Sequence, residues 1–329
     1  MDTYRSAGVD IDRGDRFVEF IKSIRSKAVD PGIGGFSAAL PIDALGFRSP
    51  VLMTTTDGTG TKLLVARELG RFDTIGIDLV AMNVNDLLVC GARPITFLDY
   101  IACGKIHEER LHEIMRGIVR GCELAGCSLG GGETAEMPDL YAPDDFDLAG
   151  FAVGLAEKEA VLPRLAEIRE GDRILALPSS GIHSNGLSLA RKVIPRSDRA
   201  GWEELLTPTI IYARQMQALT ATAKVLAAAH ITGGGLFGNL QRVIPAGLAP
   251  RFTFHWDVPP VFDRIQSLGR ISAEEMRRVF NLGLGITLIA HPNDNETLAA
   301  VARREGFPLL DVGELVPASS RRDGGAGAA

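Results

Sequence analysis

The spacing of hydrophobic residues predicts helices and strands that alternate along the whole chain. Segments with helical spacing lie at residues 15–28, 62–70, 73–91, 107–126, 187–194 and 211–229. Short apolar runs typical of strands lie at residues 50–55, 94–102, 147–157, 172–178, 284–290 and 308–316. Glycine-rich segments, which we expect to be loops, occupy residues 30–40, 130–137, 179–186 and 230–235. This order indicates an α/β fold, or an α+β fold, in each half of the chain.

A charged stretch that contains a proline, at residues 158–171, marks a boundary between two domains. The length of 329 residues also favours two domains over one large one. We expect an N-terminal domain over residues 1–165 and a C-terminal domain over residues 166–329, with a disordered tail from about residue 320.

The composition narrows the class of protein. Hydrophobic residues make up 46% and charged residues 23%, as in soluble globular proteins. The net charge of −6 gives no reason to expect nucleic acid or an acidic membrane surface as a partner. The sequence shows no signal peptide and no apolar run near the ~20 residues of a spanning helix. The four cysteines have no metal-binding spacing, so we expect reduced thiols in a cytoplasmic protein.

The helix predicted over residues 73–91 carries a polar stripe. Asp78 and Asn85 lie almost on one line along its axis, and Asp86 lies about 80° further round. Their neighbours are apolar, which favours ligand binding over a solvated face. Asp78 and Asp86 are ~12 Å apart along the helix, so they cannot both ligate one Mg²⁺ ion at about 2.1 Å. Asp57 is the natural metal partner of Asp86, and Asp78 then contacts another part of the ligand.

The segment "TTTDGTGTKL", Thr54 to Leu63, has the chemistry of a phosphate-binding turn. It follows an apolar strand and combines glycines and hydroxyl groups with one Asp and one Lys. It is not a P-loop, because the required spacing of glycine, lysine and serine or threonine is missing. The residues expected to contact a nucleotide here are Asp57, Gly58, Thr59, Thr61 and Lys62.

The glycine-rich segment at residues 130–137 permits two interpretations. Gly131 and Gly132 precede Glu133, and glycines let a phosphate or a sugar approach the backbone closely. The same pattern fits a helix end followed by a surface turn, and the residues alone do not decide between the two.

Two loops in the second half combine small polar side chains with glycines ahead of helices. The first contains Ser179, Ser180, Gly181, His183, Ser184 and Asn185, and the second contains His230, Thr232, Gly233 and Gly234. Hydroxyl, amide and backbone N–H groups before a helix favour an anion, and histidine titrates near neutral pH. We expect a phosphorylated substrate in the second half and a metal–nucleotide in the first, as two half-sites that face each other.

Together these motifs resemble those of the phosphoribosylformylglycinamidine cyclo-ligase family, also called aminoimidazole ribonucleotide synthetases. The motifs, in order, are "AGVDID", "GGFSAAL", "TTTDGTGTKL", "DTIGIDLVAMNVNDLLVCGARP", "GGETAEMP", "SSGIHSNGLSL" and "HITGGG". The resemblance covers most of the chain. It implies ATP-dependent conversion of formylglycinamidine ribonucleotide to aminoimidazole ribonucleotide in purine biosynthesis, with Mg²⁺. It also implies two α/β-type domains and a homodimer in which the N-terminal sheets of both subunits close a barrel.

The resemblance also assigns roles to residues. Asp57 and Asp86 are similar to the acids that hold the metal and the ATP phosphates, and Lys22 is similar to a lysine placed to meet a phosphate. The other positions that match nucleotide-binding motifs include Gly34, Gly35 and Glu133, and those that match the substrate loops include His183, Ser184, Asn185, His230 and Thr232. This sequence departs from the family at Ser37, where glycine is frequent, at the short stretch 195–207, and in its C-terminal tail.

The implied chemistry depends on positioning rather than on a protein nucleophile. Transfer of the γ-phosphoryl group to the formamide oxygen makes an imidate, the amidine nitrogen attacks that carbon, and phosphate leaves. Mg²⁺, Lys22 and loop N–H groups would neutralise charge in such a reaction. Either His183 or His230 could move the protons, so both are candidates with Lys22 for catalysis.

Relatives of the same architecture are alternatives. They are selenophosphate synthetase, thiamine-monophosphate kinase, formylglycinamidine synthetase and a hydrogenase-maturation dehydratase. The first typically has a cysteine or selenocysteine in its N-terminal glycine-rich segment, whereas the first cysteine here is Cys90. The dehydratase uses a C-terminal cysteine, whereas this chain ends in "GAGAA". A catalytically silent nucleotide-binding protein is a further alternative. A nicotinamide site at "GIGGFS" is excluded, because no strand precedes it and the third glycine is missing.

Overall fold

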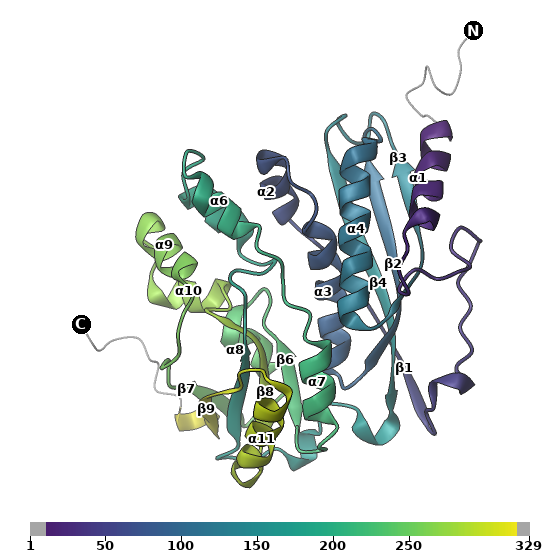
Figure 1. Cartoon of the computed structure of the whole chain (residues 1–329). Coiled ribbons are helices and arrows are strands. Elements are labelled where there is room, and N and C mark those ends of the chain that lie inside the picture. The colour runs from purple at the N-terminus through teal and green to yellow at the C-terminus, as the bar shows by residue number, and fades with distance from the viewer. Residues whose placement is uncertain (1–10, 321–329) are drawn as a thin grey trace. The chain divides into compact units, whose positions relative to one another are not determined.

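The computed structural model describes residues 11–320 of the chain (Figure 1). Its internal contacts divide the chain into two compact units. The first contains the residues up to Leu87 together with Arg93–Glu157, and the second contains Leu88–Ala92 and the chain from Lys158 onward. Residues 158–165 therefore lie in the second unit. The tail expected to be disordered lies outside the described residues.

A four-stranded sheet, in the order β1-β4-β2-β3, forms the base of the first unit. Its strands are β1 (Pro50–Gly58), β2 (Arg93–Cys103), β3 (Ser128–Glu136) and β4 (Phe146–Glu157). The helices that accompany this sheet are α1 (Ile11–Ser23), α2 (Lys62–Leu69), α3 (Ile75–Val89) and α4 (Glu108–Ala125), and a 3-10 turn lies at Asp43–Leu45. The strand β4 is antiparallel to β1 and β2, whereas β2 and β3 run parallel and are joined through α4. A parallel pair needs such a helical crossover.

The helix α3 lies beside the sheet (Figure 1), and most of its residues are buried. Its sequence is mostly apolar and interrupted by a few polar residues, which is the pattern of a helix inside a core. Leu79, Val80 and Val84 have no exposed surface. Because α3 lies inside the unit, its few polar side chains must find partners within the protein.

A five-stranded antiparallel sheet, in the order β6-β8-β5-β9-β7, forms the base of the second unit. Its strands are β5 (Arg173–Pro178), β6 (Ala227–His230), β7 (Leu248–Phe252), β8 (Leu284–Ala290) and β9 (Leu310–Pro317). Its helices are α5 (Leu187–Val193), α6 (Arg199–Leu205), α7 (Ala213–Thr220), α8 (Gly235–Gln241), α9 (Pro260–Gly269), α10 (Ala273–Val279) and α11 (Asn295–Glu305). Short 3-10 turns lie at Lys158–Ala160, Leu165–Glu167, Pro292–Asp294 and Ala318–Ser320.

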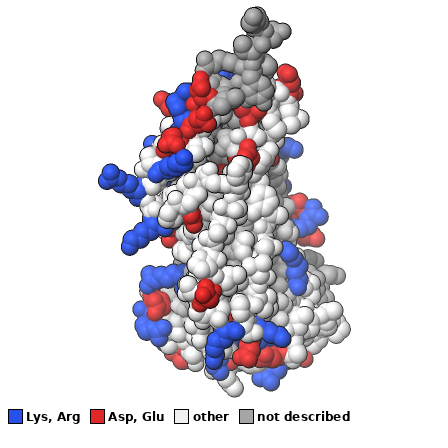
Figure 2. All heavy atoms as spheres, turned by 90° about the vertical axis from the view of Figure 1, so that its right-hand side faces the viewer, with Lys and Arg blue, Asp and Glu red and all other residues white. Residues whose placement is uncertain are grey.

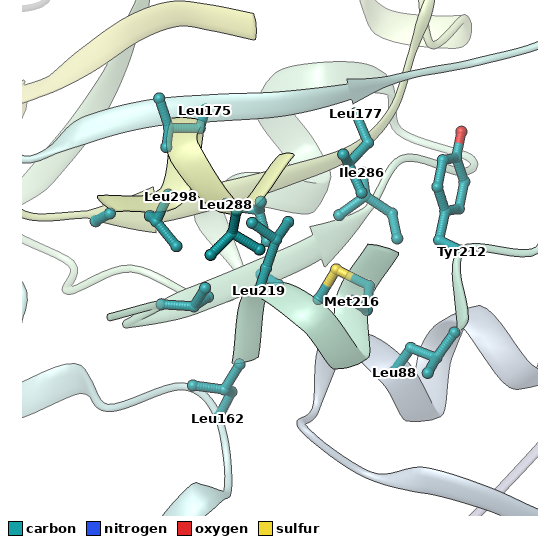
Figure 3. Close-up of a cluster of buried hydrophobic side chains, with 14 of the residues drawn as sticks. Leu88, Leu162, Leu175, Leu177, Tyr212, Met216, Leu219, Ile286, Leu288 and Leu298 are labelled. Atoms are coloured by element: carbon teal, nitrogen blue, oxygen red, sulfur yellow. The ribbon is translucent and has the colours of Figure 1, made fainter. Parts of the chain in front are cut away.

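Both faces of this second sheet carry a hydrophobic cluster. Leu175 and Leu177 of β5 belong to one cluster, whereas Ile174 and Ala176 belong to the other. Figure 3 shows the first cluster, with Leu88, Leu162, Leu175, Leu177, Tyr212, Met216, Leu219, Ile286, Leu288 and Leu298 labelled. Strands covered on both faces have continuous apolar sequences, which explains why β5 and β8 were recognisable from sequence.

Three predicted elements are wrong in extent or type. The first helix ends at Ser23 rather than at residue 28. Residues 130–136, expected to be a loop, belong to the edge strand β3, which pairs with β2. The single helix expected over residues 211–229 is instead α7 followed by the strand β6. The alanines of β6 favour a helix locally, but pairing with β8 overrides that weak preference.

Candidate active site

The predicted phosphate-binding turn connects the end of β1 to the start of α2. Asp57 is partly exposed near the end of β1, and its carboxylate accepts a 2.7 Å hydrogen bond from the backbone N–H of Gly58. Thr59 is buried, with 1% of its surface exposed, whereas Gly60 and Thr61 are exposed. The turn is therefore exposed at Gly60 and Thr61 only, and two of the expected contact residues, Thr59 and Lys62, are buried.

Lys62 and Asp78 form an ion pair inside the first unit. The Nζ atom of Lys62 lies 2.8 Å from Oδ1 of Asp78, and neither side chain has any exposed surface. Burial lowers the pKa of Lys62, and the nearby Asp78 carboxylate opposes that shift. The two side chains thus bind each other and tie the start of α2 to α3, although the sequence placed both against a nucleotide.

Of the polar stripe on α3, Asp86 is the member that reaches the surface. Asp86 is partly exposed, whereas Asn85 is fully buried. Asn83, which was not among the residues predicted from the sequence, is also fully buried and donates to the backbone carbonyl oxygen of Asp57 at 3.2 Å. Its polarity within an apolar helix was the signal that could have identified it.

Lys22 lies beside the first glycine-rich loop. A Cβ atom on Gly34 would stand 3.0 Å from Cε and 3.6 Å from Nζ of Lys22. The ammonium group is exposed and donates to Glu19 at 2.8 Å. Gly34 and Gly35 are themselves exposed, so this loop and Lys22 are accessible to solvent together.

The second predicted glycine-rich loop is the edge strand β3. Glu133 is exposed there, while the backbone of Gly132 packs against the carboxyl group of Asp99 on β2. Only glycine fits at position 132, because a Cβ would overlap that carboxyl group. Burial raises the pKa of Asp99 to about 7; its own backbone N–H opposes this rise and the charge of Glu133 adds to it. The sequence analysis did not single out Asp99.

A cavity of roughly 430 Å³ lies beside α2 in the first unit. Its lining residues come from two separate segments: Leu63, Leu64, Arg67, Tyr141, Asp145, Phe146 and Asp147. Arg67 and Asp145 form an ion pair there. None of the residues predicted from sequence lines this cavity.

In the second unit, the hydroxyl groups of the loop at residues 179–186 bind the protein itself. Ser179 donates to the carbonyl oxygen of Gly181 at 2.9 Å, and Ser180 donates to that of Pro208 at 2.6 Å. The hydroxyls of Ser184 and Thr209 are 3.1 Å apart. The loop is therefore built before any ligand arrives, and its serines stabilise it rather than offer their hydroxyls freely.

His183 is held in a fixed orientation at the centre of this loop. Its Nε2 atom accepts the backbone N–H of Ser180 at 3.2 Å, which places the proton of a neutral ring on Nδ1. Its φ angle of 58° is rare outside glycine and indicates local strain. Gly285 leaves room for this ring and for Tyr212, whose hydroxyl group donates to Pro178 at 2.6 Å. Burial raises the pKa of Tyr212, so its proton stays in place.

The two loops predicted for the substrate lie next to each other. Oδ1 of Asn185 is 3.6 Å from the position of a Cβ on Gly233. Asn239, which the sequence analysis missed, fixes the second loop by donating to the carbonyl oxygens of Thr232, Gly233 and Gly235 at 3.2, 3.2 and 2.9 Å. Gly234 before α8 has φ of 98°, and His230 at the end of β6 is 5% exposed.

The residues predicted for the nucleotide thus lie in the first unit, and those predicted for the substrate lie in the second. Within residues 11–320, no group of three or more His, Cys, Asp or Glu side chains is arranged to hold a metal ion. No helix in that part of the chain has the length and apolar character needed to cross a membrane.

Comparisons with known proteins define the class first. Residues 44–156 match the family described as AIR synthase related protein, N-terminal domain, and residues 169–322 match the corresponding C-terminal domain. The hydrogenase maturation protein HypE from E. coli shares the fold with a TM-score of 0.68 at 16% identity, over 92% of this chain and 90% of that one. HypE in complex with ATP has a TM-score of 0.65 at 18% identity, over 94% and 87% of the two chains. The chain therefore has the two-domain AIR synthase fold.

Two named relatives narrow the class to a family. The phosphoribosylformylglycinamidine cyclo-ligase of Carboxydothermus hydrogenoformans is 44% identical over 335 residues, covering 97% of both chains. That of Bordetella petrii is 45% identical over 341 residues, covering 98% of this chain and 95% of the relative. The chain belongs to the phosphoribosylformylglycinamidine cyclo-ligase family, whose members are ligases. This confirms the resemblance seen in the sequence.

Proposed function

We propose that this chain converts formylglycinamidine ribonucleotide and ATP to aminoimidazole ribonucleotide, ADP and phosphate. One observation carries the proposal: the chain matches cyclo-ligases over nearly its full length. We assign the nucleotide to the N-terminal domain and the substrate to the C-terminal domain. A neighbour of this fold, HypE, has been solved with ATP, which supports a nucleotide in the same architecture.

The nucleotide half-site consists of accessible backbone and charged groups. The exposed part of the turn after Asp57 offers backbone N–H groups to phosphate oxygens, and Lys22 beside Gly34 offers a cation. Glu133, exposed on the edge strand β3, is assigned to the same ligand together with Gly131 and Gly132.

Two carboxylates of this half-site fit Mg²⁺. Asp57 and Asp86 are both partly exposed, and both offer hard oxygen ligands. Mg²⁺ in nucleotide sites typically binds one or two carboxylates, substrate phosphates and water rather than a complete protein cage. When bound, Mg²⁺ would neutralise charge on the ATP phosphates. We assign Lys62 and Asp78 to holding the turn in place, because their buried ion pair leaves neither side chain exposed to the ligand.

The substrate half-site offers an amide and backbone groups around a fixed histidine. Asn185 reaches toward Gly233, so its amide lies where it can meet a substrate held between the two loops. Thr232, Gly234 and the backbone around Gly181 are assigned to the substrate phosphate. Hydrogen bonds from a preformed loop favour orientation, since little conformational freedom is lost on binding.

The reaction then needs orientation and proton transfer. The γ-phosphoryl group passes to the formamide oxygen, the amidine nitrogen attacks the same carbon, and phosphate leaves as the ring closes. Lys22 would neutralise charge on the transferred group. His183 and His230 are both candidates to accept the proton released by ring closure. The backbone N–H of Ser180 occupies Nε2 of His183, so His183 would accept the proton only after giving up that hydrogen bond.

A homodimer is part of the proposal. The face of the first sheet opposite its helices is apolar: Leu52 on β1 is 61% exposed and Phe151 on β4 is 45% exposed. Thr56 pairs with Phe151 across the two strands, so these side chains share one surface. Figure 2 shows a broad central area without charged side chains on the side of the molecule where this sheet lies. Apolar surfaces of this kind usually mark protein interfaces, and a second sheet would cover this one.

A cytoplasmic location is also part of the proposal. Cys90, Cys103, Cys122 and Cys127 are free thiols, which agrees with a reducing compartment.

A nucleotide-binding protein without activity is the competing function. The test is release of ADP by the purified protein with Mg-ATP, in the presence and absence of formylglycinamidine ribonucleotide. We expect release that depends on the ribonucleotide and is lost in Asp86→Asn, which keeps the shape of the side chain and removes its charge. Binding of ATP by the unaltered protein without turnover when the ribonucleotide is present would contradict the proposed reaction.

A further inference from the structure

The turn that carries Asp57 is attached to α3 at both of its ends by buried side chains. At its beginning, Nδ2 of Asn83 donates to the backbone oxygen of Asp57 at 3.2 Å and to that of Leu79 at 2.9 Å. At its end, Nζ of Lys62 lies 2.8 Å from Asp78. The side chains of Asn83, Lys62 and Asp78 are fully buried, although Asp57 itself is partly exposed, and buried polar contacts make a structure more rigid.

The sheet is shaped to admit the amide of Asn83. Gly150 on β4 pairs directly with Asp57 on β1. A Cβ atom at Gly150 would stand only 2.5 Å from Nδ2 of Asn83. Because Gly150 has no side chain, the amide of Asn83 on α3 has room to contact Asp57 near the end of β1.

The same helix carries Asp86, the other carboxylate that fits Mg²⁺. Asp86 follows Asn83 by three residues, about 4.5 Å along the helix axis. The amide of Asn83 consequently links the backbone of Asp57 to the helix that presents Asp86. Mg²⁺ demands near-ideal octahedral geometry and tolerates little displacement of its ligands.

We propose that Asn83 is a positioning residue for the metal–nucleotide: it sets the separation between Asp57 and Asp86 without touching the ligand itself. This inference rests on the proposed function, because it assumes that these two carboxylates meet the metal. A purely structural role is the alternative, in which Asn83 only satisfies two carbonyl groups and its loss lowers stability alone.

Two variants separate these roles. Asn83→Ala removes both hydrogen bonds. Asn83→Ser keeps a hydroxyl that can donate to the carbonyl four residues earlier, that of Leu79, but it is too short to replace the bond to Asp57. If the link to Asp57 matters, both variants lose the same binding property, although the serine variant is the more stable. The matched control is Ile118→Val in α4, which removes one buried methyl group from the same unit.

The experiment measures binding of Mg-ADP and, separately, of formylglycinamidine ribonucleotide by calorimetry, together with the melting temperature. Loss of a group that orients a metal ligand typically weakens binding about 10–100-fold. We expect that loss for Mg-ADP in Asn83→Ala and Asn83→Ser, with ribonucleotide binding changed less than about twofold. The control should melt a few degrees lower, by about 2–4 °C, and bind Mg-ADP as the unaltered protein does.

Three outcomes are informative. Unchanged Mg-ADP binding in a folded Asn83→Ser variant would overturn the inference. Parallel weakening of both ligands, seen also in Ile118→Val, would assign Asn83 a structural role only. Failure of the proposed function is a different result: the unaltered protein would then bind Mg-ADP without turning over the ribonucleotide.

Discussion

Asp99 provides a stringent test, because a buried carboxyl group makes stability depend on pH. Its side chain lies in β2 against Gly132, and 5% of its surface is exposed. Its pKa is raised from 3.8 to about 7, chiefly by burial, so the folded protein holds the proton more tightly than the unfolded chain does. Stability is therefore greatest below the unfolded pKa. It falls as the pH rises through about 7 and stays low above that.

The size of this effect follows from the shift. Each pKa unit corresponds to about 1.4 kcal/mol, so the rise from 3.8 to about 7 amounts to roughly 4 kcal/mol between acidic and alkaline conditions. Asp99→Asn removes the ionisation and keeps the shape of the side chain. The difference in unfolding free energy between the two proteins should then move by up to roughly 4 kcal/mol in favour of Asn as the pH rises.

The assay is urea unfolding followed by circular dichroism between pH 5 and pH 8, a window in which about 2–3 kcal/mol of the full change should appear, because the part below pH 5 lies outside it. Tryptophan fluorescence is unsuitable, because Trp202 and Trp256 both lie in the second unit whereas Asp99 lies in the first. Glu133→Gln is a directional control: the charge of Glu133 raises the pKa of Asp99, so its removal should shift the pH profile to lower pH.

Parallel pH profiles for the unaltered protein and Asp99→Asn would refute this reasoning. An offset added to a difference that changes with pH would not refute it, since a buried amide has its own hydrogen-bonding cost of about 1–3 kcal/mol. The test is whether the difference in unfolding free energy between the two proteins changes with pH.

Three further predictions concern the half-sites and the proposed dimer. Lys62→Met leaves the buried Asp78 carboxylate without its counter-ion and should lower the free energy of unfolding in urea by about 3–5 kcal/mol. The double change Lys62→Met/Asp78→Leu should recover most of that stability, and a Lys62→Met variant as stable as the unaltered protein would show that this ion pair does not hold α2 to α3. Asn185→Ala should weaken formylglycinamidine ribonucleotide roughly 10- to 150-fold by calorimetry and leave Mg-ATP unchanged; equal loss of both ligands would show that the loop does not serve the substrate alone. Leu52→Asp places a charge on the apolar face of the first sheet and should yield monomers in sedimentation experiments; a dimer of unchanged affinity would rule out this face.

The sequence alone determined the elements whose pattern reports a local environment. The strand at residues 172–178 was recognisable because both of its faces are buried and its sequence is continuously apolar. The end of α2 at Gly70 was recognisable because that residue has φ of 65° and donates to the last turn, which glycine does readily. The order of the motifs around Asp57, Asp86 and His183 was sufficient to indicate the family.

Tertiary structure decided which residues meet. The strand β3 is glycine-rich and the strand β6 is alanine-rich, and neither residue favours a strand locally. They are strands because β3 pairs with β2 and β6 pairs with β8. Lys62 appeared suited to a phosphate until the fold placed it against Asp78, 16 residues away. The contact of the Asn83 amide with Asp57, 26 residues away, could not be predicted from the sequence. Helix and strand preferences arise within a few residues, whereas these contacts depend on how a helix crosses a sheet.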